Sequence, residues 1–348
     1  MTPEEKILVT GGTGFLGSYI LRELLNEGYR NVHAIRRKES DLRLVHDLED
    51  QISWWETDLD QVDEIYESIR GAHTVIHAAG LVSFIPRDRD KLYQIHADGT
   101  GTVVNACLEH RVKRLIHISS SSALAKIKHG IPITEKTKWV DDKHISVYGR
   151  SKRLAEIEVW RGIAEGLDAI ILNPTIILGA GIWESTSCKL FFQVFRGLKY
   201  YPPGSTGFVD VRDVARIAVD MIHHPQINQS YIINGSDLSF RKLFTLIAEG
   251  LRVHPPHRLA PRWIARSLVA AEYIKSKLTG KRPIVTAETI RNAYQNFSYS
   301  NDKIRRLGYD FIPIEDTIRD TTAALLAAAQ NNFEPGLLAP RNQVKPKS

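Results

Sequence analysis

The sequence contains few cysteines and no long apolar run. Its 348 residues include only Cys107 and Cys188, which stand in apolar surroundings without metal-ligand spacing, so we expect two small buried residues, no disulfide and no metal site. No stretch of about 18 apolar residues occurs, which predicts that nothing spans a membrane. The acidic start passes directly into a strand-like segment, which predicts no signal peptide and a soluble, cytoplasmic protein.

The chain also lacks any concentrated block of one charge. The net charge is +6, but basic and acidic residues alternate along most of the sequence, and no long basic block precedes the extreme C-terminus. Nucleic acid is therefore not an expected partner. A mild positive balance suits a small anionic ligand such as a phosphorylated cofactor.

Apolar strand patterns alternate with helical patterns in the first 120 residues. The strand candidates are 6–10, 31–35, 52–56, 73–78 and 114–119, with later candidates at 168–173 and 230–234. Strands that are apolar throughout and alternate with helices indicate a parallel sheet covered on both faces. The fold class is therefore α/β, with a doubly wound parallel sheet.

A glycine-rich turn follows the first of these strands. In "ILVTGGTGFLGSYI", Gly11, Gly14 and Gly17 stand between a strand and an amphipathic helix. The first glycine permits the tight turn, the second lets the backbone approach a pyrophosphate, and the third lets the helix pack closely. The strand–turn–helix context predicts a dinucleotide site.

The second strand ends in basic residues where an NAD-binding protein would carry an acid. "AIRRKES" places Arg36 and Arg37 at this point. Two guanidiniums suit a 2′-phosphate, which favours NADP over NAD, and a solvated basic turn is the alternative.

These patterns divide the chain into a cofactor domain and a smaller lobe. We expect residues 1–175 to form a Rossmann-type dinucleotide-binding domain, to which 208–235 return. Residues 176–207 and 236–330 are expected to form a smaller, mostly helical substrate lobe. The proline-containing segment 331–348 is expected to be a flexible tail.

"SVYGRSK" sets Tyr148 and Lys152 four residues apart, on one face of a helix. Such a pair is common by chance, so its surroundings matter. Further segments in the same order are "TDLD" (57–60), "VIHAAG" (75–80), "GTGTVVNAC" (99–107), "HISSSSA" (117–123), "LNPTIILG" (172–179) and "FVDVRDVA" (208–215). With the glycine loop, they make the chain resemble the extended short-chain dehydrogenases/reductases of the NAD-dependent epimerase/dehydratase family over about residues 5–325. The most similar branch contains dihydroflavonol 4-reductases and 3β-hydroxysteroid dehydrogenases.

The resemblance implies a site, residue by residue. Its catalytic residues would be Ser120, Tyr148 and Lys152, although four consecutive serines leave Ser119 and Ser121 as alternatives. Tyr148 and Lys152 would also contact the cofactor, together with Gly11, Gly14, Phe15, Leu16, Gly17, Arg36, Arg37, Asp58, Leu59, His77, Ala78, Ala79, Gly80, Pro174 and Thr175. Dimers are common in the family, so a homodimer is expected by analogy.

Carbonyl reduction explains why these residue types occur together. It requires a hydride on carbon and a proton on oxygen. A tyrosine with its ordinary pKa of about 10 is a poor acid at neutral pH. Lys152, with the charge of the oxidised nicotinamide, is expected to lower the pKa of Tyr148, while Ser120 orients the substrate oxygen.

The sequence departs from the family pattern at positions that bear on mechanism and substrate. His96 occupies a position where many relatives have an asparagine linked to a proton relay, and a structural histidine is the simpler interpretation. Thr206 stands where nucleotide-sugar enzymes tend to have a phosphate-binding arginine. "SSSSALA" lacks the Asp–Glu pair of sugar dehydratases.

Apolar segments are candidates for the substrate pocket. Ser83 and Phe84 in "LVSFIP" are the predicted substrate residues, and an aromatic stretch could also line the pocket or fill the core of the lobe. That stretch comprises Phe191, Phe192, Phe195, Tyr200 and Tyr201. The helix predicted at 262–278 could touch a membrane surface or simply cover a core.

The sequence thus predicts an NADP(H)-dependent oxidoreductase that reduces a small ketone or aldehyde, or oxidises the alcohol. A nucleotide-sugar epimerase or dehydratase that retains NAD is the first alternative. A cofactor-binding protein without catalysis is the second.

Overall fold

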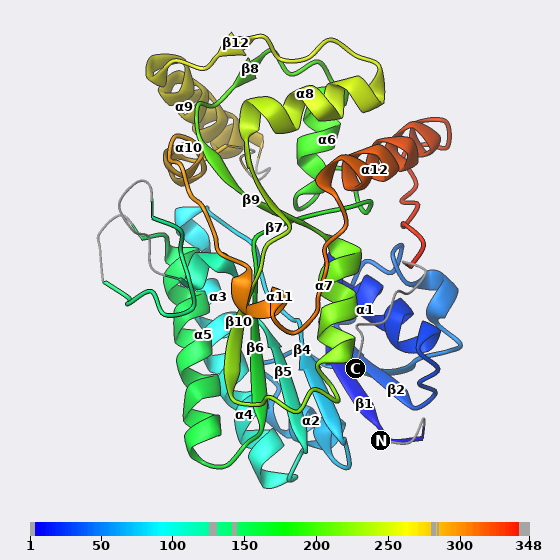
Figure 1. Cartoon of the computed structure of the whole chain (residues 1–348). Coiled ribbons are helices and arrows are strands. Elements are labelled where there is room, and N and C mark those ends of the chain that lie inside the picture. The colour runs from blue at the N-terminus through cyan, green and yellow to red at the C-terminus, as the bar shows by residue number, and fades with distance from the viewer. Residues whose placement is uncertain (1–3, 125–130, 141–144, 280–282, 284, 341–348) are drawn as a thin grey trace.

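The computed structural model describes residues 4–124, 131–140, 145–279, 283 and 285–340. In these residues, seven parallel strands form the central sheet in the order β10-β6-β5-β4-β1-β2-β3 (Figure 1). The strands are β1 Ile7–Thr10, β2 Val32–Arg36, β3 Ser53–Glu56, β4 Thr74–His77, β5 Arg114–Ile118, β6 Ala169–Pro174 and β10 Gln229–Ile233. Each was predicted to within one residue at either end.

Helices cover both faces of this sheet, as the apolar strands predicted. On one face α1 (Phe15–Asn26) packs against α7 (Val211–Asp220), and on the other α4 (Gly99–Glu109) lies between α2 (Val62–Ile69) and α5 (Val147–Ala164) (Figure 1). Successive side chains of a strand point to opposite faces. In β1, Ile7 and Val9 therefore join the core under α1, and Leu8 joins the core under α2. The doubly wound fold is confirmed.

A second lobe stands above the carboxyl ends of the strands. It contains a three-stranded sheet of β11 (Ser236–Ser239), β9 (Ser205–Asp210) and β7 (Ile176–Leu178), and the short pair β8 (Tyr200–Tyr201) and β12 (Arg258–Leu259). Its helices are α6 Cys188–Phe195, α8 Phe240–Leu251, α9 Arg262–Thr279, α10 Ala287–Ala293 and α12 Ile314–Ala329. The short α11 (Asp302–Arg305) lies beside β10 of the large sheet (Figure 1).

The aromatic stretch packs inside this lobe. Phe191 is fully buried, and Phe192 and Phe195 each pack edge-on against Phe333. These rings therefore fill a core, which was one of the two interpretations of the sequence.

The C-terminal segment lies against the body of the protein up to Pro340, where the sequence favoured a flexible tail. Leu338 is buried, and its backbone N–H donates to the hydroxyl of Tyr19 on α1 at 3.0 Å. The Phe333 contacts join this segment to the second lobe, and the Leu338 hydrogen bond joins it to the domain of the central sheet.

Short helical turns carry residues toward the sheet edge between β4 and α4. They are η2 Pro86–Asp88, α3 Arg89–Tyr93 and the π-helical η3 Gln94–Asp98. Two further turns lie elsewhere: η1 His46–Leu48 between β2 and β3, and η4 Ser121–Ala123 after β5. Single π-helical turns often occur at functional sites. His96 lies within η3.

Candidate active site

The glycine loop has the geometry that a dinucleotide requires. Gly11 has φ of +72°, and a Cβ there would lie 2.7 Å from the backbone of Ala79, so only glycine fits. A Cβ on Gly17 would lie 2.0 Å from the carbonyl oxygen of Gly11, so this glycine lets α1 begin directly against the turn. No side chain caps α1 at Gly14, which leaves the amides of Phe15 and Leu16 at an uncapped helix N-terminus. The loop therefore fits a pyrophosphate.

The "HAAG" segment is fixed beside this loop. The amide of Ala79 donates to the Thr10 hydroxyl at 3.1 Å, and that of Ala78 to the Thr10 carbonyl at 3.2 Å. His77 points into the protein instead, between the hydroxyls of Thr10 and Thr100 at 2.7 and 3.1 Å. Its side chain therefore holds the strand end in place, and only the backbone of 77–80 follows the edge of the site.

The residues predicted for the adenosine side lie at the ends of β2 and β3. Arg36 is half-buried, with its guanidinium 5.8 Å from the centre of the Trp54 ring, whereas Arg37 is exposed in the following turn. Asp58 uses one carboxylate oxygen to accept from the Leu59 amide at 2.8 Å. Leu59 itself is buried under Gly99, so it acts as a core residue.

Pro174 is the last residue of β6, and Thr175 follows it. The Thr175 hydroxyl donates to the Asn234 side chain at 3.1 Å, and the residue is buried. Thr175 therefore connects β6 to the chain after β10, and its side chain is occupied within the protein.

Helix α5 begins next to the serine segment because Gly149 lacks a side chain. A Cβ at Gly149 would lie 2.6 Å from the carbonyl oxygen of Ser122. Ser146 caps the helix by accepting from the Gly149 amide at 2.7 Å. This close approach brings Tyr148, on the first turn of α5, to the end of β5.

The structure distinguishes among the consecutive serines. Ser119 donates to the buried carboxylate of Glu156 at 2.6 Å. Ser120 forms a hydrogen bond with the phenol of Tyr148, and Ser121 forms one with the phenol of Tyr299. Of these three serines, only Ser120 is therefore hydrogen-bonded to the phenol of Tyr148.

Burial dominates the acid–base properties of that pair. It raises the pKa of Tyr148, and the Ser120 hydrogen bond acts in the opposite direction. It also lowers the pKa of Lys152 to about 8, against the carboxylate of Glu156, which raises it. Lys152 donates to the Ile118 carbonyl at 2.9 Å. In the described residues the pKa of Tyr148 is thus raised, and the contribution that lowers it comes from the Ser120 hydrogen bond and not, as the sequence predicted, from Lys152.

His96 is a structural link between the chain just after the "HAAG" segment and helix α5. Its Nε2 accepts from the Leu81 amide at 3.0 Å, which leaves the proton on Nδ1 for the Ser151 hydroxyl at 2.8 Å. Ser151 in turn donates to the Tyr148 carbonyl at 2.9 Å. The ring packs edge-on against the Tyr148 ring, and burial lowers the pKa of His96 to about 2. A neutral, doubly hydrogen-bonded ring orients Tyr148.

Three buried histidines should make the folded protein less stable in acid. Burial lowers the pKa of His77 to about 3, that of His96 to about 2, and that of His117 well below its ordinary value. In the unfolded chain these groups titrate near pH 6.5, so below that pH the unfolded state binds more protons. The free energy of unfolding should therefore fall as the pH drops from about 6.5 toward 4, by about 1.4 kcal/mol per pH unit for each histidine.

Urea unfolding between pH 7 and 4 measures this loss. We expect His96→Asn to reduce the slope by about one histidine's share. Equal slopes for wild type and His96→Asn would contradict a neutral, buried His96.

The predicted substrate residues play different parts. Ser83 is buried and donates to the Asp88 carboxylate at 2.5 Å, so its hydroxyl shapes the loop. Phe84 packs edge-on against the Tyr148 ring, with centroids 5.5 Å apart, and so lies beside the phenol.

Tyr299 was missed in the sequence because it lies about 150 residues beyond Tyr148 and belongs to no motif. Its phenol forms hydrogen bonds with Ser121 and with Thr206 on β9. Its backbone pairs with Ile133 in an isolated β-bridge. A neutral hydroxyl group therefore occupies the position next to Thr206, and its partner Ser121 directly follows Ser120 in the chain.

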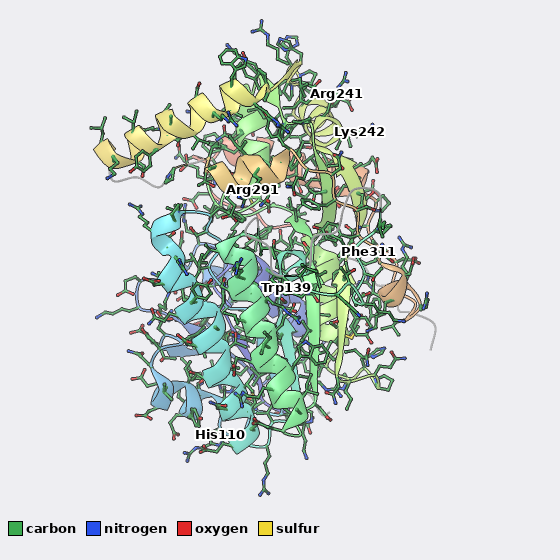
Figure 2. The ribbon with its side chains drawn as sticks, turned by 90° about the vertical axis from the view of Figure 1, so that its left-hand side faces the viewer. His110, Trp139, Arg241, Lys242, Arg291 and Phe311 are labelled. Atoms are coloured by element: carbon green, nitrogen blue, oxygen red, sulfur yellow. The ribbon has the colours of Figure 1, made fainter. Side chains whose placement is uncertain are left out.

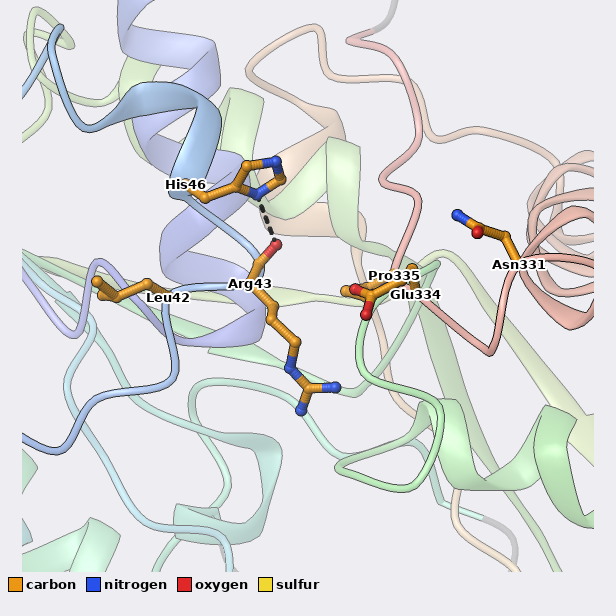
Figure 3. Close-up of a pocket in the computed structure, with 6 residues that line it drawn as sticks. All are labelled: Leu42, Arg43, His46, Asn331, Glu334 and Pro335. Atoms are coloured by element: carbon orange, nitrogen blue, oxygen red, sulfur yellow. Dashed lines mark hydrogen bonds between the residues drawn. The ribbon is translucent and has the colours of Figure 1, made fainter.

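A surface groove opens between the chain after β2 and the C-terminal segment (Figure 3). Its lining residues are Leu42, Arg43, His46, Asn331, Glu334 and Pro335. None of the predicted catalytic residues lines it. The Arg43 guanidinium is held by Asp41, with the closest N···O distance 2.6 Å.

Comparisons with known proteins agree with this geometry. The profile of the NAD dependent epimerase/dehydratase family matches residues 7–234. The chain belongs to this family. It is similar to cinnamoyl-CoA reductase 1 of Oryza sativa subsp. japonica, with 26% identity over 95% of this chain and 93% of the relative. A bifunctional dihydroflavonol 4-reductase/flavanone 4-reductase of Pyrus communis is 25% identical over 70% of this chain and 76% of its own length. The crystal structure of gox2253 aligns with a TM-score of 0.79 and 27% identity over 94% of this chain and 99% of the other.

This member of the epimerase/dehydratase family is an NAD(P)-dependent oxidoreductase. In the described residues, no group of three or more His, Cys, Asp or Glu could hold a metal ion. None of the described helices is long and apolar enough to cross a membrane.

Proposed function

We propose that this enzyme reduces a ketone or aldehyde with NADPH, or oxidises the corresponding secondary alcohol with NADP. The observation that carries the proposal is the buried Tyr148 phenol, hydrogen-bonded to Ser120 and one helical turn from Lys152. The names of the similar reductases support a carbonyl substrate.

The residues of the chain position the substrate and supply a proton, while the nicotinamide, when bound, supplies or accepts the hydride. Ser120 holds the carbonyl oxygen by a hydrogen bond, which orients it toward Tyr148. Tyr148 donates its phenolic proton to that oxygen as negative charge develops there. Lys152 is fixed by the Ile118 carbonyl near Gly80, and its positive charge favours the phenolate that the proton transfer leaves.

The glycine loop and the "HAAG" segment would hold the cofactor in this proposal. Their residues are Gly11, Gly14, Phe15, Leu16 and Gly17, followed by His77, Ala78, Ala79 and Gly80. The cofactor would also be surrounded by Asp58, Leu59, Pro174 and Thr175. Asp58 would contact it through its carboxylate, and the other three through their backbones. Phe84 lies where it could contact the substrate, whereas Ser83 would act through the shape of its loop.

The proposal is tested by NADPH consumption against a panel of apolar and aromatic ketones and aldehydes. Turnover of at least one compound is expected, with one alcohol formed for each NADPH oxidised. If the purified chain instead retains NAD and interconverts a nucleotide sugar without net consumption of NADPH, the epimerase alternative holds. Cofactor binding without turnover of any compound would favour the non-catalytic alternative.

The hydrogen-bond partners of Thr206 argue against a nucleotide-sugar substrate. A diphosphate is best recognised by arginine or lysine. At this position the Thr206 and Ser121 hydroxyls share the Tyr299 phenol instead. A substrate with an uncharged polar group and an apolar body fits these residues better than a nucleotide sugar does.

For the cofactor, we propose NADP in preference to NAD. Arg37 is exposed at the end of β2, and no ion pair in the described residues involves it. Arg37→Ala should weaken NADPH binding by about 10- to 100-fold, the loss expected for one charge-assisted hydrogen bond, and leave NADH binding nearly unchanged. Titration of both cofactors by intrinsic fluorescence measures this, with the exposed Lys38→Ala as the matched control. Equal losses for NADPH and NADH would mean that Arg37 does not bind the 2′-phosphate and belongs to a solvated basic turn.

We also propose a homodimer and a cytoplasmic location. Leu154 and Ile157 are three residues apart on α5, and both are exposed, so they form an apolar spot on a sheet-flanking helix. Cys107 and Cys188 are buried free thiols, which suits a reducing compartment.

A further inference from the structure

Helix α9 presents an apolar face to solvent. It runs from Arg262 to Thr279 over 18 residues, a length of about 27 Å, and it packs mainly against α10. Figure 2 shows α9 as a long helix extending away from the rest of the lobe. In the described residues, Trp263, Ile274 and Leu278 on this helix are 69%, 58% and 82% exposed.

Three of the five large apolar residues that α9 exposes, Trp263, Ile274 and Leu278, share one face, which also includes Ser267, and the covered residues share the opposite face. The other two, Leu268 and Tyr273, are 48% and 60% exposed and lie outside this face, one on each side of it. At about 100° per residue, positions 263, 270, 274 and 278 fall within about 80° of arc. Ala265, Val269, Glu272 and Ser276 lie on the other side of the helix and are the more buried residues. The apolar face therefore does not cover the core of the lobe, as an amphipathic helix ordinarily does.

Basic residues flank this apolar face on both sides. Arg262, Arg266 and Lys277 lie along one flank and Lys275 along the other. The single acid of the helix, Glu272, is turned inward, with 15% of its side chain exposed, and is paired with Lys275 at 3.5 Å. The outward surface of α9 is thus apolar in the middle and positive at its edges.

We propose that α9 docks on an anionic lipid surface, with its apolar face buried at the level of the headgroups. An interfacial helix has this arrangement: tryptophan and aliphatic residues on one side, bordered by Lys and Arg that meet anionic lipid. The charges decide against a second copy of the chain as the occupant. Face-to-face pairing of two α9 helices, in either orientation, would bring basic flank against basic flank.

The test uses the full chain and vesicles of defined composition. Cosedimentation with vesicles of equal parts phosphatidylcholine and phosphatidylglycerol should be strong, and binding to phosphatidylcholine alone at least about tenfold weaker. Arg262→Gln with Arg266→Gln should weaken binding to the anionic vesicles roughly tenfold or more. The matched pair Lys91→Gln with Lys113→Gln removes two exposed charges elsewhere and should leave binding unchanged.

Trp263 provides an independent readout. Its fluorescence should shift to the blue on vesicle binding, and Trp263→Phe should lose that shift while still cosedimenting. Trp263→Ser with Ile274→Ser should abolish cosedimentation and leave thermal unfolding unchanged, because both side chains are exposed. Equal binding to both vesicle types, or unchanged binding of the Arg262/Arg266 variant, would overturn the proposal. Conversion of a dimer to a monomer by the Trp263/Ile274 variant would overturn it too, and would assign the face to a subunit interface.

Discussion

Tyr148→Phe is expected to lower kcat/KM for carbonyl reduction by about 10²- to 10⁴-fold, the range attributed to a positioned general acid. The substitution removes only the hydroxyl. The ring contacts with Phe84 and His96 remain, so the fold and cofactor affinity should be preserved. Steady-state kinetics with the most active compound of the carbonyl panel measures the loss.

Three controls separate this role from general damage. Tyr66→Phe changes a half-buried tyrosine on α2, far along the chain from the catalytic helix, and should be silent. Ser120→Ala should also lower kcat because it removes the hydroxyl bonded to the phenol. Ser119→Ala should mainly reduce stability because its hydroxyl donates to Glu156. Wild-type turnover by Tyr148→Phe would rule out the proposed proton donor.

Glu156→Ala is expected to reduce the free energy of unfolding by about 3–5 kcal/mol. This carboxylate is 2% exposed and accepts from Ser119 at 2.6 Å, from the Asn173 amide, and from Arg153 at 3.1 Å. Its removal leaves buried donors without their acceptor. Urea unfolding of the wild type and the variant gives the difference.

The same helix offers a matched control. Glu158 is paired with Arg161 at 2.9 Å, but it is one-third exposed, so Glu158→Ala should change stability by at most about 1 kcal/mol. Glu156 also raises the pKa of Lys152, so its loss should move any pH-dependent activity governed by Lys152 to lower pH. Similar losses from both substitutions would mean that Glu156 is not the anchor of a buried network.

The sequence alone determined the sheet and the cofactor loop. Both depend on local patterns: strands that are apolar on both faces, and glycines whose spacing reflects a tight turn beside the neighbouring strand β4. The φ of +72° at Gly11 and the lack of room at Gly17 are the physical basis of that spacing. The order of the remaining segments was sufficient to recognise the family and the Tyr148–Lys152 pair.

Only the tertiary structure decided which serine meets Tyr148, because four identical side chains in a row differ in nothing but their partners. Glu156 accepts a hydrogen bond from Ser119, and the phenol of Tyr299 is hydrogen-bonded to Ser121. The role of His96 depended likewise on Leu81, in the loop after β4, and on Ser151, on α5.

The direction of α9 was also undetermined by its sequence. An amphipathic pattern states that one face differs from the other, but not which face meets the protein. The packing of the lobe places Ala265 inward and Trp263 outward. Local backbone chemistry can therefore be read from the order of residues, whereas hydrogen-bond partners and the exposed face depend on contacts between distant segments.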